Sequence, residues 1–294
     1  MKILVLGSNG QLGRCLFDHF GKTDYEVIFA TKSEIDLSNI TSLKKIILAI
    51  KPQIVINAAA YTAVDKAEEE FSQADLINHL AVANVANICN ELGAWIIHIS
   101  TDYVFDGLAR VPYDEGHQVS PKSAYGKSKL NGEIAIATSG SKYIIIRTAW
   151  VFSEYGNNFL KTMLRLGKEL DELNIVGDQI GCPTYAQDLA KSIISIVSKI
   201  DLDDSRSGIY HFCGDESCTW YEFALAIFKE SKSLNMITPK SINAIQTIDF
   251  PTAATRPPYS VLDCYKIKDT FNITPSNWRH GIKDALKNIG ILND

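Results

Sequence analysis

The stretch that decides the fold is residues 3–13, Ile3-Leu4-Val5-Leu6-Gly7-Ser8-Asn9-Gly10-Gln11-Leu12-Gly13. Its four apolar residues predict a short buried strand, and Leu16, Phe17 and Phe20 predict a helix directly after the glycines. A glycine-rich turn between a strand and a helix lets the backbone approach a pyrophosphate at the positive end of the helix dipole. The spacing is GxxGxxG. We interpret it as a dinucleotide-binding turn, with a plain turn as the alternative.

Strands and helices alternate through the first half of the chain. Further strands are expected at Glu26–Ala30, Ile54–Asn57, Trp95–Ser100 and Tyr143–Arg147, with helices between them. This alternation predicts an α/β protein with a Rossmann-type doubly wound parallel sheet. After residue 152 the pattern loosens. We therefore expect an NAD(P)-binding domain at 1–150 and a smaller α/β substrate-binding domain at 151–294, with segments at about 184–212 threading back.

The composition is that of an ordinary soluble protein. The chain has 294 residues and a net charge of −5, without a run of lysine or arginine, which argues against nucleic-acid and membrane-surface binding. No apolar run approaches the ~20 residues that span a bilayer, and no signal-peptide pattern is present. The six cysteines show neither CxxC nor metal-type spacing. A cytoplasmic protein with reduced thiols and no bound metal is expected.

Cofactor preference is predicted from the end of the second strand. A site selective for NAD usually places an acid there, for the ribose 2′-hydroxyl. Here Thr31, Lys32 and Ser33 follow, and the first acids are Glu34 and Asp36. A lysine between two hydroxyls suits a 2′-phosphate, so NADPH is the predicted cofactor and NADH the alternative. Lys32 could equally be a solvated loop cation.

Tyr125 and Lys129 form the candidate catalytic pair. They are four residues apart in a predicted helix, Ser123–Ala137, and therefore share one face. A neighbouring cation favours phenolate, so the pair could exchange a proton with a substrate oxygen. Thr101 follows the predicted strand that ends at Ser100, where its hydroxyl could hold the same oxygen. Alone, such a pair is more often solvent-facing.

Seven motifs, in order, resemble those of the dTDP-4-dehydrorhamnose reductases, a branch of the extended short-chain dehydrogenase/reductase family. They cover nearly the whole chain and are GSNGQLG (7–13), NAAAYTAVDKAE (57–68), STDYVFDG (100–107), SAYGKSKLNGE (123–133), RTAWVF (147–152), GNNF (156–159) and RPPYSVLD (256–263).

The resemblance implies NAD(P)H-dependent reduction of the C4 carbonyl of dTDP-4-dehydro-L-rhamnose to dTDP-L-rhamnose. Tyr125 would donate a proton to the carbonyl oxygen, and Thr101 would orient that oxygen. Lys129 would lower the pKa of Tyr125 and bond the nicotinamide ribose. The implied cofactor contacts are Gly7, Asn9, Gly10, Gln11, Leu12, Gly13, Thr31, Lys32, Asp36, Leu37, Ala58, Ala59 and Ala60, with Tyr125 and Lys129. The implied substrate contacts are Val64, Thr101, Asp102, Tyr125, Trp150, Asn157 or Asn158, and Arg256 for the diphosphate.

Several alternatives stay open. A related 4,6-dehydratase would carry Asp-Glu after the threonine, where this chain has Asp102-Tyr103, and an epimerase would have Ser-Ser in place of Ser100-Thr101. Another nucleotide-linked 4-keto sugar, such as the precursor of 6-deoxy-talose, is a second possible substrate. A non-catalytic NADP-binding regulatory subunit is a third reading. The protein is expected to be a monomer or homodimer. The metal-bridged dimer of some relatives is disfavoured, because the expected acids are missing at Cys15 and near Gln187.

Overall fold

The computed structural model describes residues 1–200 and 205–293. Within them, a six-stranded parallel sheet has the order β10-β5-β4-β3-β1-β2. The connection from β1 runs outward to β2, whereas β3 lies on its other side, so the topology reverses between β1 and β3. The predicted doubly wound sheet is confirmed. Its strands are β1 (Lys2–Leu6), β2 (Glu26–Ala30), β3 (Ile54–Asn57), β4 (Trp95–Thr101), β5 (Lys142–Thr148) and β10 (Gly208–His211).

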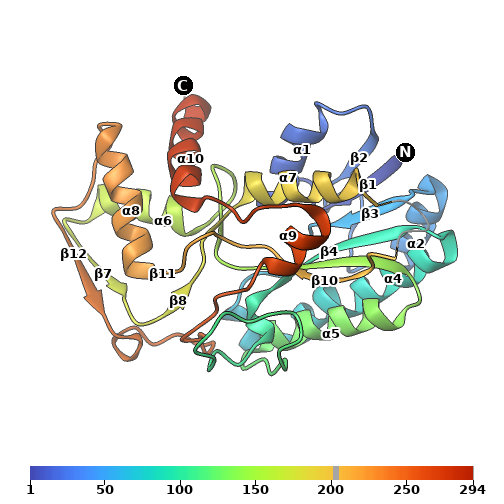
Figure 1. Ribbon diagram of the computed structural model, residues 1–294, viewed down its shortest axis with the longest axis horizontal. Helices are drawn as coiled ribbons and strands as arrows, with labels where there is room; N and C mark the ends of the chain where they lie inside the picture. The colour runs from blue at the N-terminus through green and yellow to red at the C-terminus, as the bar shows by residue number, and fades with distance from the viewer. Residues whose placement is uncertain (201–204, 294) are drawn as a thin grey trace.

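Helices cover both faces of the sheet (Figure 1). One face carries α1 (Gln11–Phe20) and α7 (Ala186–Val197), and the other carries α2 (Ile40–Ile50), α4 (Ala81–Leu92) and α5 (Ala124–Thr138). Alternate residues of β1 enter opposite cores: Ile3 and Val5 on the α1 side, Leu4 and Leu6 on the α2 side. The central strands are thus buried on both faces of the sheet, which explains why their sequences are continuous apolar runs.

The helical segment between β3 and β4 is interrupted. It comprises α3 (Phe71–Asp75), a π-helical turn (Leu76–Leu80) and α4, preceded by a 3₁₀ turn at Lys66–Glu68. The π-helical turn brings Asn78, which is almost fully buried, against α5, where its side chain donates to Ser128 Oγ at 3.0 Å. A Cβ at Gly132 would lie 2.2 Å from the Asn78 carbonyl oxygen. Only glycine allows α5 to approach this closely.

The smaller lobe has its own core, built around Phe152, Leu160, Phe223 and Trp278. Thr219 caps α8 and forms a capping box with Glu222. Its helices are α6 (Phe159–Glu169), α8 (Trp220–Ser233) and α10 (Trp278–Asn293). Its strand pairs are β6 (Val151–Phe152) with β9 (Thr184–Tyr185), β7 (Glu172–Val176) with β12 (Ser241–Ile245), and β8 (Ile180–Gly181) with β11 (Cys218–Thr219).

The region 238–262 is rich in proline, threonine and serine, and it contains β12 and a 3₁₀ turn at Thr247–Asp249. β12 is mostly exposed, so its residues lack the alternation of a half-buried strand. Parallel pairing with β7 holds this segment in the extended conformation, which its local sequence does not predict.

Two segments from the second half of the chain lie on the six-stranded sheet. α7 packs beside α1, and β10 pairs in parallel with β5, from Gly208 opposite Ile144 to His211 opposite Arg147. The short helix α9 (Tyr265–Phe271) lies next to β10 (Figure 1). The sheet is therefore completed by chain that has already passed through the smaller lobe.

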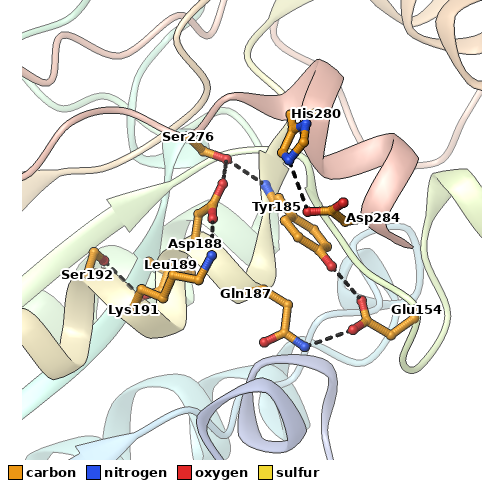
Figure 2. A network of polar contacts seen from close by, with 10 residues as sticks. All are labelled: Glu154, Tyr185, Gln187, Asp188, Leu189, Lys191, Ser192, Ser276, His280 and Asp284. Carbon is orange, nitrogen blue, oxygen red and sulfur yellow. Dashed lines mark hydrogen bonds and ion pairs between the residues drawn. The ribbon is translucent and has the colours of Figure 1, made fainter. Parts of the chain in front are cut away.

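A polar network joins the two lobes at the start of α7 (Figure 2). The buried carboxylate of Glu154 accepts from Gln187 Nε2 at 2.7 Å and from the Tyr185 hydroxyl at 3.2 Å. Gln187 Nε2 also donates to Asp18 Oδ2 at 3.0 Å. A cavity of about 460 Å³ lies beside this network, and Lys22, Lys191 and Lys287 are among its lining residues. The predicted site residues are not part of this lining.

Candidate active site

The glycine turn has the geometry of a pyrophosphate site. Gly7 has φ +79°, and a Cβ there would lie 2.8 Å from Ala59. A Cβ at Gly13 would lie 2.3 Å from the Gly7 carbonyl oxygen. Gly10 is the N-cap of α1 and provides no side chain to cap the first N–H groups. The turn therefore combines a bare helix N-terminus with close backbone approach, and these residues fit a dinucleotide.

The side chain of Gln11 points away from the helix N-terminus. Its Nε2 donates to the Val151 carbonyl at 3.2 Å, and its Oε1 accepts from Asn158 Nδ2 at 2.7 Å. Asn158 also caps α6, because its Oδ1 accepts from the Lys161 N–H at 3.1 Å. The side chain of Asn158 thus ties the glycine turn to the smaller lobe, whereas Asn157 is exposed.

At the end of β2 a carboxylate folds back onto the strand. Glu34 accepts from the Thr31 N–H and from the Thr31 hydroxyl, both at 2.8 Å. Lys32 is exposed beside them, and Asp36 accepts from the Ser38 N–H at 2.9 Å. From the sequence we did not expect the Glu34 carboxylate at the end of β2, because Glu34 follows Thr31 by three residues. The turn brings the carboxylate back into contact with Thr31.

Tyr125, Lys129 and Thr101 converge at the start of α5. Ser123 caps this helix, and the carboxylate of Glu68 accepts from the Ala124 N–H at 2.9 Å, which adds a favourable charge at the positive end. Tyr125 is 9% exposed and Lys129 only 1%. Burial raises the pKa of the Tyr125 phenol, and a hydrogen bond with the Thr101 hydroxyl offsets part of this rise. The three predicted catalytic residues are thus brought together.

The predicted effect of Lys129 on Tyr125 is not found. Burial raises the pKa of Tyr125 above its ordinary value, and Lys129 is not among the groups that lower it. Lys129 Nζ instead donates to the Ile99 carbonyl at 2.7 Å and lies 3.1 Å from His98 Nε2. Burial also lowers the pKa of Lys129 to about 8. The phenol is therefore held protonated, as a proton donor requires.

A buried ion pair lies one turn further along α5. Glu133 and Arg147 of β5 are 2% exposed, and three guanidinium–carboxylate hydrogen bonds of 2.7 to 3.2 Å join them. The hydroxyl of Ser100 also donates to Glu133. Arg147 Nη1 lies 3.5 Å from His211 Nε2. This cluster fixes the carboxyl ends of β4 and β5 behind Lys129.

Arg256 reaches the site from the far end of the sequence. Its Nη2 pairs with Asp65 Oδ2 at 2.6 Å, and its Nη1 donates to the Tyr103 hydroxyl at 2.9 Å. The Tyr103 ring packs edge-on against Tyr125, with centroids 5.7 Å apart. Val64 packs against the cluster that contains Tyr125. Arg256 and Val64 therefore lie close to Tyr125, and their role as substrate contacts stays a prediction.

Asp102 and Trp150 occupy constrained positions. The Asp102 carboxylate accepts from the Thr101 hydroxyl at 2.9 Å, and burial raises the pKa of Asp102 to about 6. Trp150 has φ +47° and stacks on Trp220 with ring centroids 3.5 Å apart. A Cβ at Gly181 would lie 2.5 Å from the Trp150 ring. The indole thus forms a rigid wall between the lobes.

Sequence reasoning missed several residues that hold these groups. Asn57, His98, Glu133, Arg147 and Tyr103 had no assigned role, although all but His98 stand within the quoted motifs. The available signal was a polar residue inside an otherwise apolar strand, as at His98 and Arg147. Such residues are buried only when partners satisfy them.

The comparisons with known proteins agree over the whole chain. The RmlD substrate binding domain family matches residues 1–291. The dTDP-4-dehydrorhamnose reductase of Aggregatibacter actinomycetemcomitans is 45% identical over 291 residues, which cover 98% of each chain. This chain belongs to the dTDP-4-dehydrorhamnose reductase family. Among solved structures, the reductase of Clostridium acetobutylicum is similar with a TM-score of 0.92 and 40% identity, over 99% of this chain and 100% of that one.

A second solved member of the reductase family carries a cofactor. The dTDP-4-dehydrorhamnose reductase of Bacillus anthracis, in complex with NADP, has a TM-score of 0.89 and 38% identity, over 98% of this chain and 99% of that one. Across the described residues, no helix has both the length and the apolar character needed to cross a bilayer.

Proposed function

We propose that this protein reduces the C4 carbonyl of dTDP-4-dehydro-L-rhamnose to give dTDP-L-rhamnose, with NADPH as reductant. The observation that carries the proposal is the convergence of Thr101, Tyr125 and Lys129 in a chain of this family. When bound, NADPH supplies the hydride. The residues of this chain supply the proton, the orientation and the exclusion of water.

The roles of the three residues follow from their surroundings. Reduction places negative charge on the carbonyl oxygen, and the protonated Tyr125 phenol donates to that oxygen. Thr101, which bonds both Tyr125 and Asp102, orients the oxygen beside the phenol. Lys129 connects α5 to β4 through its hydrogen bond to the Ile99 carbonyl. It also contacts the nicotinamide ribose in this proposal.

NADPH is proposed over NADH on two grounds. The relative from Bacillus anthracis was solved with NADP, and the exposed Lys32 stands at the end of β2, where a 2′-phosphate would lie. Glu34 opposes this preference. Its carboxylate accepts hydrogen bonds from Thr31, the residue directly before Lys32, so a negative charge lies close to Lys32. Use of NADH as a second cofactor is the expected result of the two opposing charges.

Arg256 is the proposed contact for the substrate diphosphate. Its guanidinium fork suits phosphate oxygens, and it lies beside Tyr103, next to the catalytic phenol. Binding would require it to exchange Asp65 for the diphosphate. We further propose a cytoplasmic location, since six free thiols, including Cys213 and Cys264 with Sγ atoms 3.6 Å apart, fit a reducing compartment.

The test is oxidation of NADPH, followed by its absorbance, with enzymatically generated dTDP-4-dehydro-L-rhamnose. Consumption should require the keto sugar. In Tyr125→Phe turnover should fall by about 10²–10⁴-fold, the range for a lost general acid, with cofactor affinity nearly unchanged. An undiminished rate would remove Tyr125 from the mechanism. A rhamno product, identified by NMR of the sugar ring protons, is expected, and a talo product would overturn the substrate assignment.

A regulatory, non-catalytic role is the second candidate. It would predict that NADPH binds but is not consumed with any nucleotide-linked 4-keto sugar. The burial of Thr101, Tyr125 and Lys129 and the contact between Thr101 and Tyr125 favour the enzyme, because a protein that only binds cofactor needs no buried proton donor.

A further inference from the structure

Trp150 carries a large side chain on a backbone conformation that favours glycine. Its φ of +47° lies in the left-handed region, where a bulky residue stays only if its surroundings enforce it. Three successive carbonyl groups are held here. The Ala149 carbonyl accepts from the Thr184 hydroxyl at 2.7 Å, and the Trp150 carbonyl accepts from the Thr184 N–H at 3.2 Å. The Val151 carbonyl accepts from Gln11 Nε2 at 3.2 Å. The direction in which the indole leaves the backbone is therefore fixed.

Two residues of the smaller lobe hold the indole ring itself. Strands β8 and β11 pair with Cys218 opposite Gly181, on the side of this lobe that faces the sheet (Figure 1). Gly181 lies against the Trp150 ring, because an added Cβ would be 2.5 Å from the ring atom Cε2. Trp220, directly after β11, stacks on the same ring with centroids 3.5 Å apart and planes 9° apart. One strand pair thus supplies both contacts.

Trp220 is in turn held by the core of the smaller lobe. Its ring centroid lies 4.7 Å from that of Phe159 on α6. Phe159 stacks on Phe223 of α8 with centroids 5.3 Å apart, and Phe223 is fully buried. Trp150 and Trp220 are only partly buried. A column of aromatic rings therefore runs from the core of the smaller lobe to Trp150, and Trp220 is the ring that connects the two.

This column ends at the edge of the sheet that carries the catalytic residues. Thr148, the last residue of β5, pairs with Thr101 at the end of β4, and Trp150 follows Thr148 by two residues. In doubly wound sheets, ligands bind outside the carboxyl ends of the strands. A partly buried indole at this edge offers apolar surface to the C–H groups of a sugar ring.

We propose that Trp220 is a positioning residue for the substrate: it fixes the Trp150 indole before the sugar binds, so that binding does not have to immobilise this side chain. The identity of the sugar rests on the proposed function, whereas the fixed state of the indole does not. If Trp220 served only the core of the smaller lobe, its loss would lower stability and leave affinity for the sugar nucleotide unchanged.

The first measurement needs no substrate. Two stacked indoles couple their electronic transitions and give a paired positive and negative band in circular dichroism. The full-length protein should show this band pair, and Gly181→Ala should weaken it by displacing the Trp150 ring. Trp278→Phe is the matched control, because Trp278 is fully buried in the same lobe and its ring packs on Phe223. This control should keep the band pair. A missing band pair in the wild type, or an unchanged one in Gly181→Ala, would overturn the proposal.

The second measurement is calorimetric binding of dTDP-L-rhamnose to the full-length protein. In Trp220→Leu, affinity should fall by roughly three- to tenfold, the cost of immobilising one side chain on binding, and NADPH affinity should not change. Trp220→Phe keeps a stacked ring and should restore most of the affinity, although it removes the band pair. Trp278→Phe should lower the melting temperature and leave affinity as in the wild type.

Unchanged dTDP-L-rhamnose affinity in Trp220→Leu would refute the positioning role. Should that variant not fold, Gly181→Ala decides, because displacing the Trp150 ring should weaken dTDP-L-rhamnose binding to the same extent. A wild-type protein that does not bind dTDP-L-rhamnose would count against the proposed function. The band pair would then still decide whether Trp220 fixes Trp150, so the two failures are distinguishable.

Discussion

Removal of Glu133 should expose the cost of an unpaired buried charge. In Glu133→Ala, Arg147 would lose three hydrogen bonds to a carboxylate while its guanidinium stays about 3% exposed. Breaking a buried ion pair from one side costs about 3–5 kcal/mol of unfolding free energy. For 294 residues the entropy of unfolding is ~0.6 kcal/mol/K, so the melting temperature should fall by about 5–8 °C.

The assay is thermal and urea-induced unfolding of the variant beside a matched control. Glu169→Ala breaks the Arg165–Glu169 pair, whose side chains are 60% and 52% exposed, and should cost about 0.3–0.5 kcal/mol. The double change Glu133→Leu with Arg147→Met should recover most of the loss, since no charge is then left buried. If Glu133→Ala is as mild as Glu169→Ala, Arg147 is solvated and the argument from burial is wrong.

Three further changes test other parts of the structure. The pKa of buried His211 is lowered to about 3, so the unfolded chain binds one more proton between that value and about 6.5, and stability falls as the pH drops through this window. Between about pH 7.5 and 5.5, the free energy of unfolding in urea should therefore fall by about 1.4 kcal/mol less for His211→Gln than for the wild type. Equal decreases would mean that other groups cause the pH dependence. Gly7→Ala places a Cβ 2.8 Å from Ala59 at φ +79°, and calorimetry should show NADPH affinity reduced by tenfold or more, roughly the cost of such strain. Lys32→Asp should shift the ratio of specificity constants toward NADH, and an unchanged ratio would mean that Lys32 does not meet the 2′-phosphate.

The sheet could be predicted because its strands are recognisable locally. The run from Trp95 ends in the structure at Thr101, one residue beyond the prediction, since a strand buried on both faces needs apolar residues throughout. β12 could not be predicted in this way. It is a mostly exposed strand that is held in place by pairing with β7. The two strands are 69 residues apart in the sequence at the Asn174–Asn243 contact, and the sequence of β12 alone does not indicate this partner.

In the candidate site, too, local features could be predicted and contacts between distant residues could not. The spacing of Tyr125 and Lys129 placed both on one helix face, and the family resemblance gave that spacing its meaning. The contacts of Lys129 could not be foreseen, because His98 lies 31 residues away along the chain and contacts Asn57 on the neighbouring strand. The prediction about the Tyr125 pKa failed for this reason: spacing shows that a lysine is near, but it shows neither how deeply the phenol is buried nor which groups the lysine bonds.

The position of β10 has a consequence for how the protein is made. The edge of β5 and the sheet face beneath α7 stay uncovered until the chain has been synthesised as far as His211, well after the last of the other five strands. A chain cut after residue 150 would leave that edge open to pairing with other molecules, and the apolar face bare. Within the described residues, no single cut in the chain separates the six-stranded sheet from the smaller lobe, so residues 1–150 are not expected to fold as an independent domain.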